Sequence, residues 1–280
     1  MNLQAKKVLY IDLFKRESEV KSHKDLNKYI GGVGLGAKIL KDFNHKDAVV
    51  FSVGPLSGMF PYASKTSVLF RDGKEVRDLY LGGSLSSRIK FSGLDAILIF
   101  GLSAKPAVLD VMGEKVTFED ADVDVGKLGL PGKKSFINVD EKNALLDGYF
   151  RGSGNYLHKI LIQKNLKSFV ITGSKTFELK NFEKYTELYD KILERVDEML
   201  VEKGGNSSCV GCPLGCGKSK TGEDGGNVLV HSLVACSFAE PIYSEENTVF
   251  SCLNSLGYDY THEDIENLPK LVYDVLEDLV

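Results

Sequence analysis

Three of the five cysteines in this 280-residue chain lie within eight residues, at Cys209, Cys212 and Cys216. This C-x2-C-x3-C spacing is a strong constraint, because thiolates so close in sequence can converge on one soft metal centre. Gly211 and Gly215 allow the backbone to curl so that its N–H groups point at sulfur. A cubic [4Fe–4S] cluster takes one thiolate per iron, so a fourth ligand has to come from elsewhere.

A structural zinc site is the first alternative, and it would use four Cys or His ligands, typically arranged as two pairs. The chain has one triplet instead, and the nearest later candidates are His231 and Cys236. Disulfides are disfavoured because the cysteine count is odd, the cysteines are sparse and the first residues are polar, without the apolar core of a signal peptide. We favour a [4Fe–4S] cluster over zinc and over reduced thiols without metal.

The two later cysteines differ in their surroundings. Cys236 follows the triplet in a stretch that we expect to be helical, and it is a candidate for the fourth ligand; the alternative is a packed helix residue. Cys252 lies in an apolar helical stretch, where a free cysteine usually behaves as a small core residue.

The composition is that of an ordinary globular protein, with 43% hydrophobic and 26% charged residues. The net charge of −4 gives no case for nucleic acid, which favours a basic patch or stripe. No run approaches the roughly 18 consecutive apolar residues of a membrane helix. We therefore expect a cytoplasmic protein that binds neither nucleic acid nor membrane.

Short β-type runs dominate the first 175 residues. The run from Ala96 to Phe100 is apolar throughout, as expected for a strand covered on both faces. Further strands are predicted at 8–13, 48–53 and 66–70, with a hairpin over 106–118 and helices over 26–43 and 85–91. The glycine cluster at 31–36 does not follow a strand, so it is not a dinucleotide fingerprint, and we expect a tightly packed helix or turn.

The pattern changes near residue 181, where apolar residues begin to recur at helical spacing until Gly204 and Gly205. Further helices are predicted at 227–240, 246–256 and 268–279. The sequence thus predicts an α+β fold, with a β-rich platform domain over 1–175 and a small helical domain over 176–280. The cysteine loop at 208–218 lies between the helix that ends near residue 204 and the helix expected at 227–240.

Several segments, in this order, resemble the aldehyde ferredoxin oxidoreductase family. They are 29–36, 53–58, 82–106, 164–167, 209–217 and 256–259. No single glycine motif is specific, but the ordered set anchored by the cysteine triplet is. The resemblance implies the family's tungsten or molybdenum chemistry, in which a bis-pterin metal centre beside a [4Fe–4S] cluster oxidises aldehydes and passes electrons to ferredoxin.

By the same resemblance, the β-rich part corresponds to the platform on which the pterins lie, with Lys65, Gly82 and Gly83 at the matching positions. The platform is degenerate, because Lys65 stands where the family has an arginine and lacks the bidentate fork that suits phosphate. Bulky residues, Tyr156, Leu157 and Ile162, replace the family's glycine-rich segment. We therefore expect the isolated chain to hold no tungsto- or molybdo-bispterin and to oxidise no aldehyde.

The resemblance covers only the first half or so of a typical family member, whose later part supplies the fourth cysteine. We expect an iron–sulfur oxidoreductase or electron-transfer subunit that a second chain, or self-association, completes, with a ferredoxin-like electron acceptor. The alternative is a non-catalytic scaffold stabilised by an iron–sulfur cluster or zinc. The surface at 209–218 and 229–238 is expected to be open and partly apolar.

Overall fold

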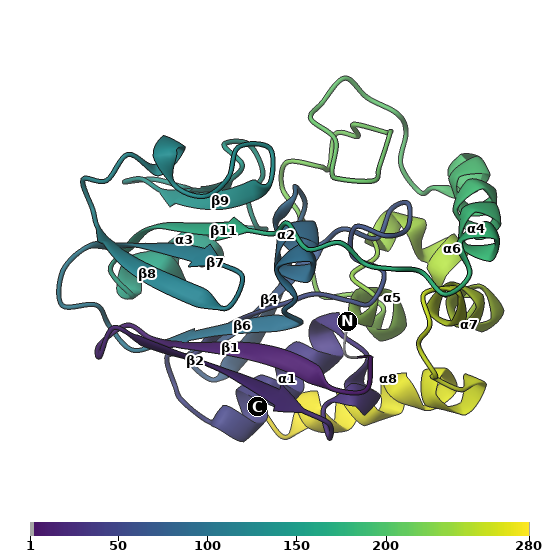
Figure 1. The fold of residues 1–280 in the computed structure, drawn as a ribbon, viewed down its shortest axis with the longest axis horizontal. Coiled ribbons are helices and arrows are strands. Elements are labelled where there is room, and N and C mark those ends of the chain that lie inside the picture. The colour runs from purple at the N-terminus through teal and green to yellow at the C-terminus, as the bar shows by residue number, and fades with distance from the viewer. Residues whose placement is uncertain (1–2, 280) are drawn as a thin grey trace.

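The computed structural model describes residues 3–279 and has three layers: a five-stranded sheet, a seven-stranded sheet and a layer of helices (Figure 1). The strand order in the larger sheet is β12-β5-β4-β3-β6-β1-β2, and in the smaller one β10-β9-β11-β7-β8. The α+β fold predicted from the sequence is confirmed. The strands are β1 (Lys6–Asp12), β2 (Glu17–His23), β3 (Val49–Ser52), β4 (Thr66–Asp72), β5 (Glu75–Leu81), β6 (Ala96–Phe100), β7 (Ala107–Met112), β8 (Lys115–Asp120), β9 (Lys134–Val139), β10 (Ala144–Leu146), β11 (Leu166–Thr172) and β12 (Glu223–Asp224).

The larger sheet is covered on both faces, which explains its continuous apolar strands. Along β6, Ala96 and Leu98 belong to the core shared with the helices, whereas Ile97 and Ile99 belong to the core between the two sheets. Because side chains alternate between the faces of a strand, one apolar run serves both cores. The expected strand over 96–100 and the expected hairpin, now β7 and β8, are confirmed.

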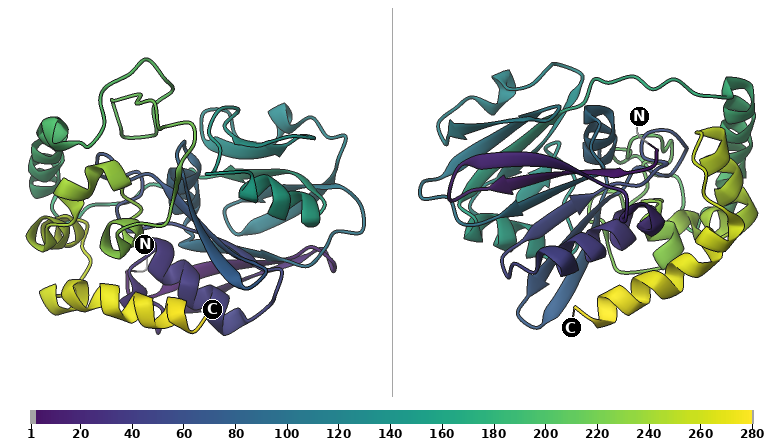
Figure 2. Two further views of the ribbon diagram at one scale, coloured as in Figure 1. Left: turned by 180° about the vertical axis from the view of Figure 1, so that it is seen from behind. Right: turned by 60° about the horizontal axis from the view of Figure 1, so that its bottom comes forward.

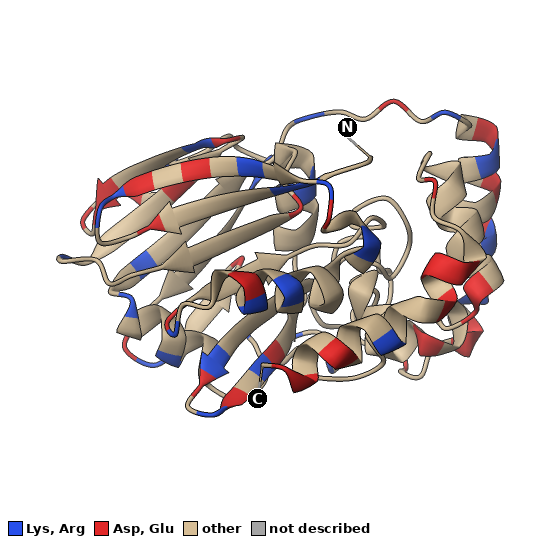
Figure 3. Cartoon of the chain, turned by 90° about the horizontal axis from the view of Figure 1, so that it is seen from below, with Lys and Arg blue, Asp and Glu red and all other residues tan. Residues whose placement is uncertain are grey.

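Helices α1 (Gly32–Phe43) and α8 (His262–Glu277) lie side by side on the face of the larger sheet that is turned away from the smaller one (Figure 2). α8 begins at a capping box between Thr261 and Asp264 and buries Ile265 and Leu268, while its acidic residues stay on the outer face (Figure 3). The remaining helices are α2 (Leu85–Ser92), α3 (Tyr156–Gln163), α4 (Phe182–Glu194), α5 (Val228–Ser232), α6 (Glu240–Tyr243) and α7 (Glu246–Ser255).

The glycine cluster at 31–36 forms the tight packing that we expected. A Cβ added to Gly32 would lie 1.9 Å from the His231 carbonyl oxygen, and one added to Gly54 would lie 2.3 Å from that of Leu233. Three backbone segments therefore cross at a distance that only glycine permits. This crossing fixes the end of α5 against the start of α1 and the loop that follows β3.

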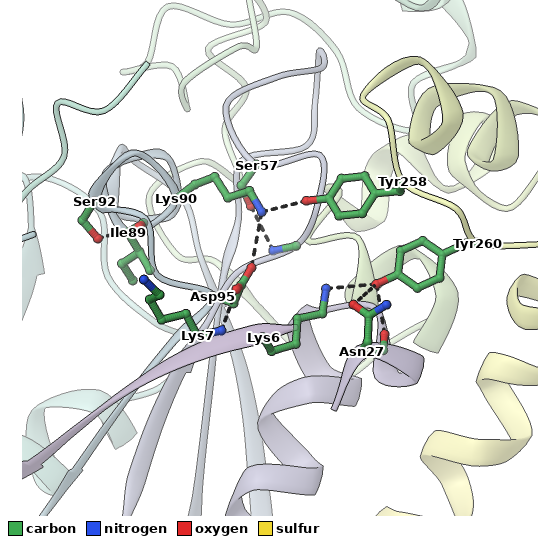
Figure 4. A network of polar contacts seen from close by, with 11 residues as sticks. Lys6, Lys7, Asn27, Ser57, Ile89, Lys90, Ser92, Asp95, Tyr258 and Tyr260 are labelled. Carbon is green, nitrogen blue, oxygen red and sulfur yellow. Dashed lines mark hydrogen bonds and ion pairs between the residues drawn. The ribbon is translucent and has the colours of Figure 1, made fainter. Parts of the chain in front are cut away.

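Two buried lysines, Lys6 on β1 and Lys90 on α2, contact the stretch between α7 and α8 (Figure 4). The Lys90 ammonium lies 2.9 Å from the Tyr258 hydroxyl and 3.4 Å from Asp95, and Lys6 donates to Tyr260 over 3.0 Å. The helical part and the larger sheet thus share both a polar network and one apolar core. The division into two domains near residue 175 stays a prediction.

Candidate iron–sulfur site

Four cysteines from two separate segments of the chain line one pocket. Cys209, Cys212 and Cys216 come from the loop before β12, and Cys236 comes from the stretch after α5. The loop between β3 and β4 adds Lys65. The other lining residues are Tyr62, Ser64, Met199, Val201, Leu214, Gly215, Lys218, Ser219 and Phe238.

Backbone hydrogen bonds hold the cysteine loop on the end of the larger sheet. The amide of Val210 donates to the Gly83 carbonyl over 3.3 Å, and the amide of Tyr62 donates to the Gly211 carbonyl over 3.1 Å. Within the loop, Cys212 N–H donates to the Cys209 carbonyl over 3.1 Å. The C-x2-C turn is therefore closed by its own backbone, and both of its cysteines line the same pocket.

Cys236 reaches the pocket because the chain leaves the helix early. The expected single helix over 227–240 is wrong: α5 ends at Ser232, and Val234 adopts a left-handed φ of 55°. That conformation is costly for a β-branched residue. It is offset by two hydrogen bonds to the β3–β4 loop, from Lys65 N–H to the Val234 carbonyl (2.9 Å) and from Cys236 N–H to the Tyr62 carbonyl (2.8 Å).

Lys65 is buried in an ion pair with Glu223, with Nζ and Oε1 2.7 Å apart and side-chain exposures of 3% and 9%. Burial by itself lowers the pKa of Lys65, but Cys236 and Glu223 outweigh it, so the pKa lies well above its ordinary value. The second Glu223 oxygen accepts from Ser237 Oγ over 2.7 Å. Sequence reasoning missed Glu223, because nothing local shows which carboxylate will meet a buried lysine.

The four pocket cysteines are partly buried. Burial raises the pKa of Cys212 to about 11 and that of Cys236 well above its ordinary value. The backbone groups of Leu214 and Phe238 partly offset this rise in pKa, and the Cys236 thiol itself donates to Glu223 Oε1 over 3.6 Å.

Among residues 3–279, no group of three or more His, Cys, Asp and Glu side chains forms a site for a single metal ion. Zn–S bonds of about 2.3 Å would bring the sulfurs of a tetrahedral zinc site to about 3.8 Å from one another. In a cubane each thiolate binds a different iron, so the sulfurs stand further apart around a shared space. The four cysteines that line the pocket match the number of thiolates that a cubane takes.

The residues at the platform positions do not fit a pterin. Lys65 is buried and already paired with Glu223. A Cβ on Gly82 would lie 2.7 Å from the Cys209 sulfur, and one on Gly83 would lie 2.9 Å from the Phe150 ring. The open backbone that glycine offers a ligand is thus occupied here by the protein itself.

The bulky segment before residue 164 forms helix α3. Leu157 is buried in the core between the two sheets, Tyr156 is half-buried, and Ile162 is 44% exposed. The replacement of glycines is therefore a packing change, in which α3 covers part of the smaller sheet rather than offering backbone to a ligand.

We expected residues 209–218 and 229–238 to form an open surface, and for most of the second segment this prediction is wrong. Residues 228–235 are buried against α1 and the β3–β4 loop, because the glycine crossing draws α5 into the core. The cysteine loop itself is the exposed part, with Val210 37% exposed, and nearby Leu200 is 63% exposed.

His231 lies beneath the site and is a core residue. Its Nε2 is 2.7 Å from Ser237 Oγ, and its ring packs on Tyr80 with ring centroids 3.6 Å apart. Burial lowers the pKa of His231 to about 4. The unfolded chain binds the proton near pH 6.5 and the folded protein only near pH 4, so His231 stabilises the fold above pH 6.5 and loses this contribution as the pH falls to 4.

We expect this loss to amount to about 3 kcal/mol in the free energy of unfolding. Asp78, whose pKa burial raises to about 7, holds its proton in the folded state and acts in the opposite direction over the same range. The measurement is therefore the difference in the free energy of unfolding between wild type and His231→Gln, obtained by urea unfolding at several pH values from 7 to 4. Parallel pH profiles for the two proteins would contradict the prediction.

The chain thus combines two β-sheets that share a core with a cysteine-rich loop held at the end of the larger sheet. Residues 8–140 match the family described as aldehyde ferredoxin oxidoreductase, N-terminal domain. The resemblance to the aldehyde ferredoxin oxidoreductase family that the ordered sequence motifs indicated is thereby confirmed over this region. Within residues 3–279, no helix has the length and apolar character needed to cross a membrane.

Two curated relatives come from Pyrococcus. The tungsten-containing aldehyde ferredoxin oxidoreductase of Pyrococcus abyssi is 26% identical over 208 residues, which cover 64% of this chain and 34% of that protein. The aliphatic sulfonate oxidoreductase, WOR-like subunit, of Pyrococcus furiosus is 30% identical over 146 residues, or 47% of this chain and 23% of that protein. The chain thus spans about a third or less of the length of these relatives.

A solved structure shares the fold. The active site complex BamBC of benzoyl coenzyme A reductase, with 1,5 dienoyl-CoA, contains a chain that superposes with a TM-score of 0.61 at 14% identity. The match covers 98% of this chain and 63% of that one, so the likeness of fold continues past residue 140 into the helical part.

Proposed function

We propose that this chain carries a [4Fe–4S] cluster on Cys209, Cys212, Cys216 and Cys236 and serves as an electron-transfer subunit of an aldehyde ferredoxin oxidoreductase-like enzyme. The observation that carries the proposal is that these four cysteines, from two separate segments of the chain, line one pocket. A cluster there would supply one-electron transfer, and the chain would hold it, shield it from water and place the Lys65 charge beside it.

We further propose that no tungsto- or molybdo-bispterin binds to the platform of this chain. Lys65 is already paired with Glu223, and Cys209 and Phe150 fill the space over Gly82 and Gly83. Oxidation of an aldehyde or a related substrate would then take place on another part of the enzyme, and this chain would relay the electrons.

If the substrate is oxidised on another part of the enzyme, this chain needs a partner. One relative is named as a subunit, and the structural neighbour is part of a complex, so we propose that a second subunit, or another copy of this chain, covers the cysteine loop. Exposed lysines at 203, 218 and 220 favour a ferredoxin-like, acidic electron acceptor. The five free cysteines suit the reducing cytoplasm, where we place the protein.

Metal analysis of protein purified without oxygen tests the proposal. We expect brown protein with about four irons and four inorganic sulfides per chain, and no tungsten or molybdenum in this chain. A colourless protein with about one zinc per chain would refute the cluster and favour the metal-stabilised scaffold. Stoichiometric tungsten or molybdenum in the homogeneous chain would refute the proposal that no bispterin binds to the platform. It would not affect the proposal of an iron–sulfur cluster.

A further inference from the structure

The side chain of Ser219 lines the same pocket as the four cysteines, and its hydroxyl has no hydrogen-bond partner among residues 3–279. The residue is only 3% exposed. A buried hydroxyl without a partner costs about 1–3 kcal/mol, so such groups in folded proteins usually meet a ligand, an ion or water. The proposed function already places one such group, the cluster, in this pocket, and the inference below rests on it.

Backbone contacts fix Ser219 beside Cys209. Its N–H donates to the Cys216 carbonyl over 3.2 Å, which closes a turn directly after the last cysteine of the triplet. A Cβ built on Gly82 would meet both the Cys209 sulfur at 2.7 Å and the Ser219 carbonyl oxygen at 3.2 Å. Ser219 therefore shares one corner of the pocket with Cys209, and the sequence pattern extends to C-x2-C-x3-C-x2-S.

We propose that the Ser219 hydroxyl donates a hydrogen bond to a sulfur at the Cys209 corner of the cluster and raises its reduction potential. An added electron increases the negative charge on the sulfurs, so a hydrogen bond to sulfur stabilises the reduced cluster more than the oxidised one. Four cysteines already provide one thiolate per iron, so the hydroxyl acts as a donor and not as an iron ligand.

The test compares wild type with Ser219→Ala, Ser219→Thr and Ser207→Ala, all purified as the full chain without oxygen. Ser207 lies in the same loop and is exposed, so its variant controls for the loss of a hydroxyl as such. Iron content and a redox titration followed by EPR are the readouts. We expect equal iron in all four proteins and a lower midpoint potential in Ser219→Ala alone.

The expected size is about a tenfold fall in the ratio of reduced to oxidised cluster at the wild-type midpoint, equivalent to about 59 mV for one electron. Ser219→Thr keeps the hydroxyl and should keep the wild-type potential and EPR signal. An unchanged potential in a fully loaded Ser219→Ala protein would overturn the inference and leave the proposed cluster intact.

Two other outcomes also decide the matter. Loss of iron in Ser219→Ala but not in Ser219→Thr would make the oxygen an iron ligand and overturn its role as a donor. A lower potential in both Ser219 variants would show that packing, not the hydroxyl, sets the potential. Wild-type protein without iron would overturn the proposed function and this inference together, which separates that failure from a failure at Ser219.

Discussion

Replacement of Cys209, Cys212 or Cys216 by serine is expected to remove most of the iron from protein purified without oxygen. Each thiolate would bind a different iron of the cluster, and the three depend on convergence within one short loop. A serine oxygen is a harder ligand than sulfur and is protonated at neutral pH, so it replaces a thiolate poorly. The measurement is iron and sulfide per chain, together with the visible spectrum.

Cys236→Ala and Cys252→Ala make this experiment sharper. Cys236 lines the pocket, so its variant should lose iron as the triplet variants do. Cys252 is fully buried on α7 and does not line the pocket, so its variant should keep the cluster and controls for the loss of a buried thiol. About four irons retained in all three serine variants would show that the cluster assignment is wrong.

If Cys236→Ala keeps a full cluster, the fourth ligand has to come from another molecule. If that variant also sediments as a monomer with no second chain, then neither Cys236 nor another molecule supplies the fourth ligand. A cluster that survives only in an associated form would instead support the covering partner. The two proposals about the fourth ligand therefore give different results in one preparation.

Gly54→Ala is expected to destabilise the fold by about 3 kcal/mol, because the new methyl group would lie 2.3 Å from the Leu233 carbonyl oxygen. The contact is with backbone, so no side-chain rotation can relieve it. Gly54 does not have a positive φ, so the effect isolates steric overlap from backbone strain. The measurement is the free energy of unfolding in urea, with protein that carries no metal.

Gly205→Ala is the matched control, since a Cβ there meets nothing within 4 Å. We expect the control to change stability by less than about 0.5 kcal/mol. Because the crossing also positions Val234 opposite Lys65, Gly54→Ala should take up less iron than the control does. Equal stability of the two variants would show that the crossing is not as tight as the backbone indicates.

Features that depend on neighbouring residues could be predicted from local sequence patterns. The apolar run at 96–100 predicts a doubly covered strand, which the structure has. The three cysteines of the C-x2-C-x3-C motif line one pocket, and their role as cluster ligands stays a prediction. The glycine cluster at 31–36 predicts close packing in the same way. The ordered motifs, rather than any single one, were what indicated the family.

Only the tertiary structure shows which residues from other segments lie beside the three cysteines of the loop. The apolar residues at 228–235 predict a continuous helix, but pairing of 234–236 with 62–65 replaces helical hydrogen bonds with bonds to a distant loop. That pairing brings Cys236 and Lys65 to the pocket, and Glu223 meets Lys65 across 158 positions of chain. Hydrophobic patterns record which residues are buried, but they do not record which buried residues become neighbours, because that depends on how the sheets and helices pack.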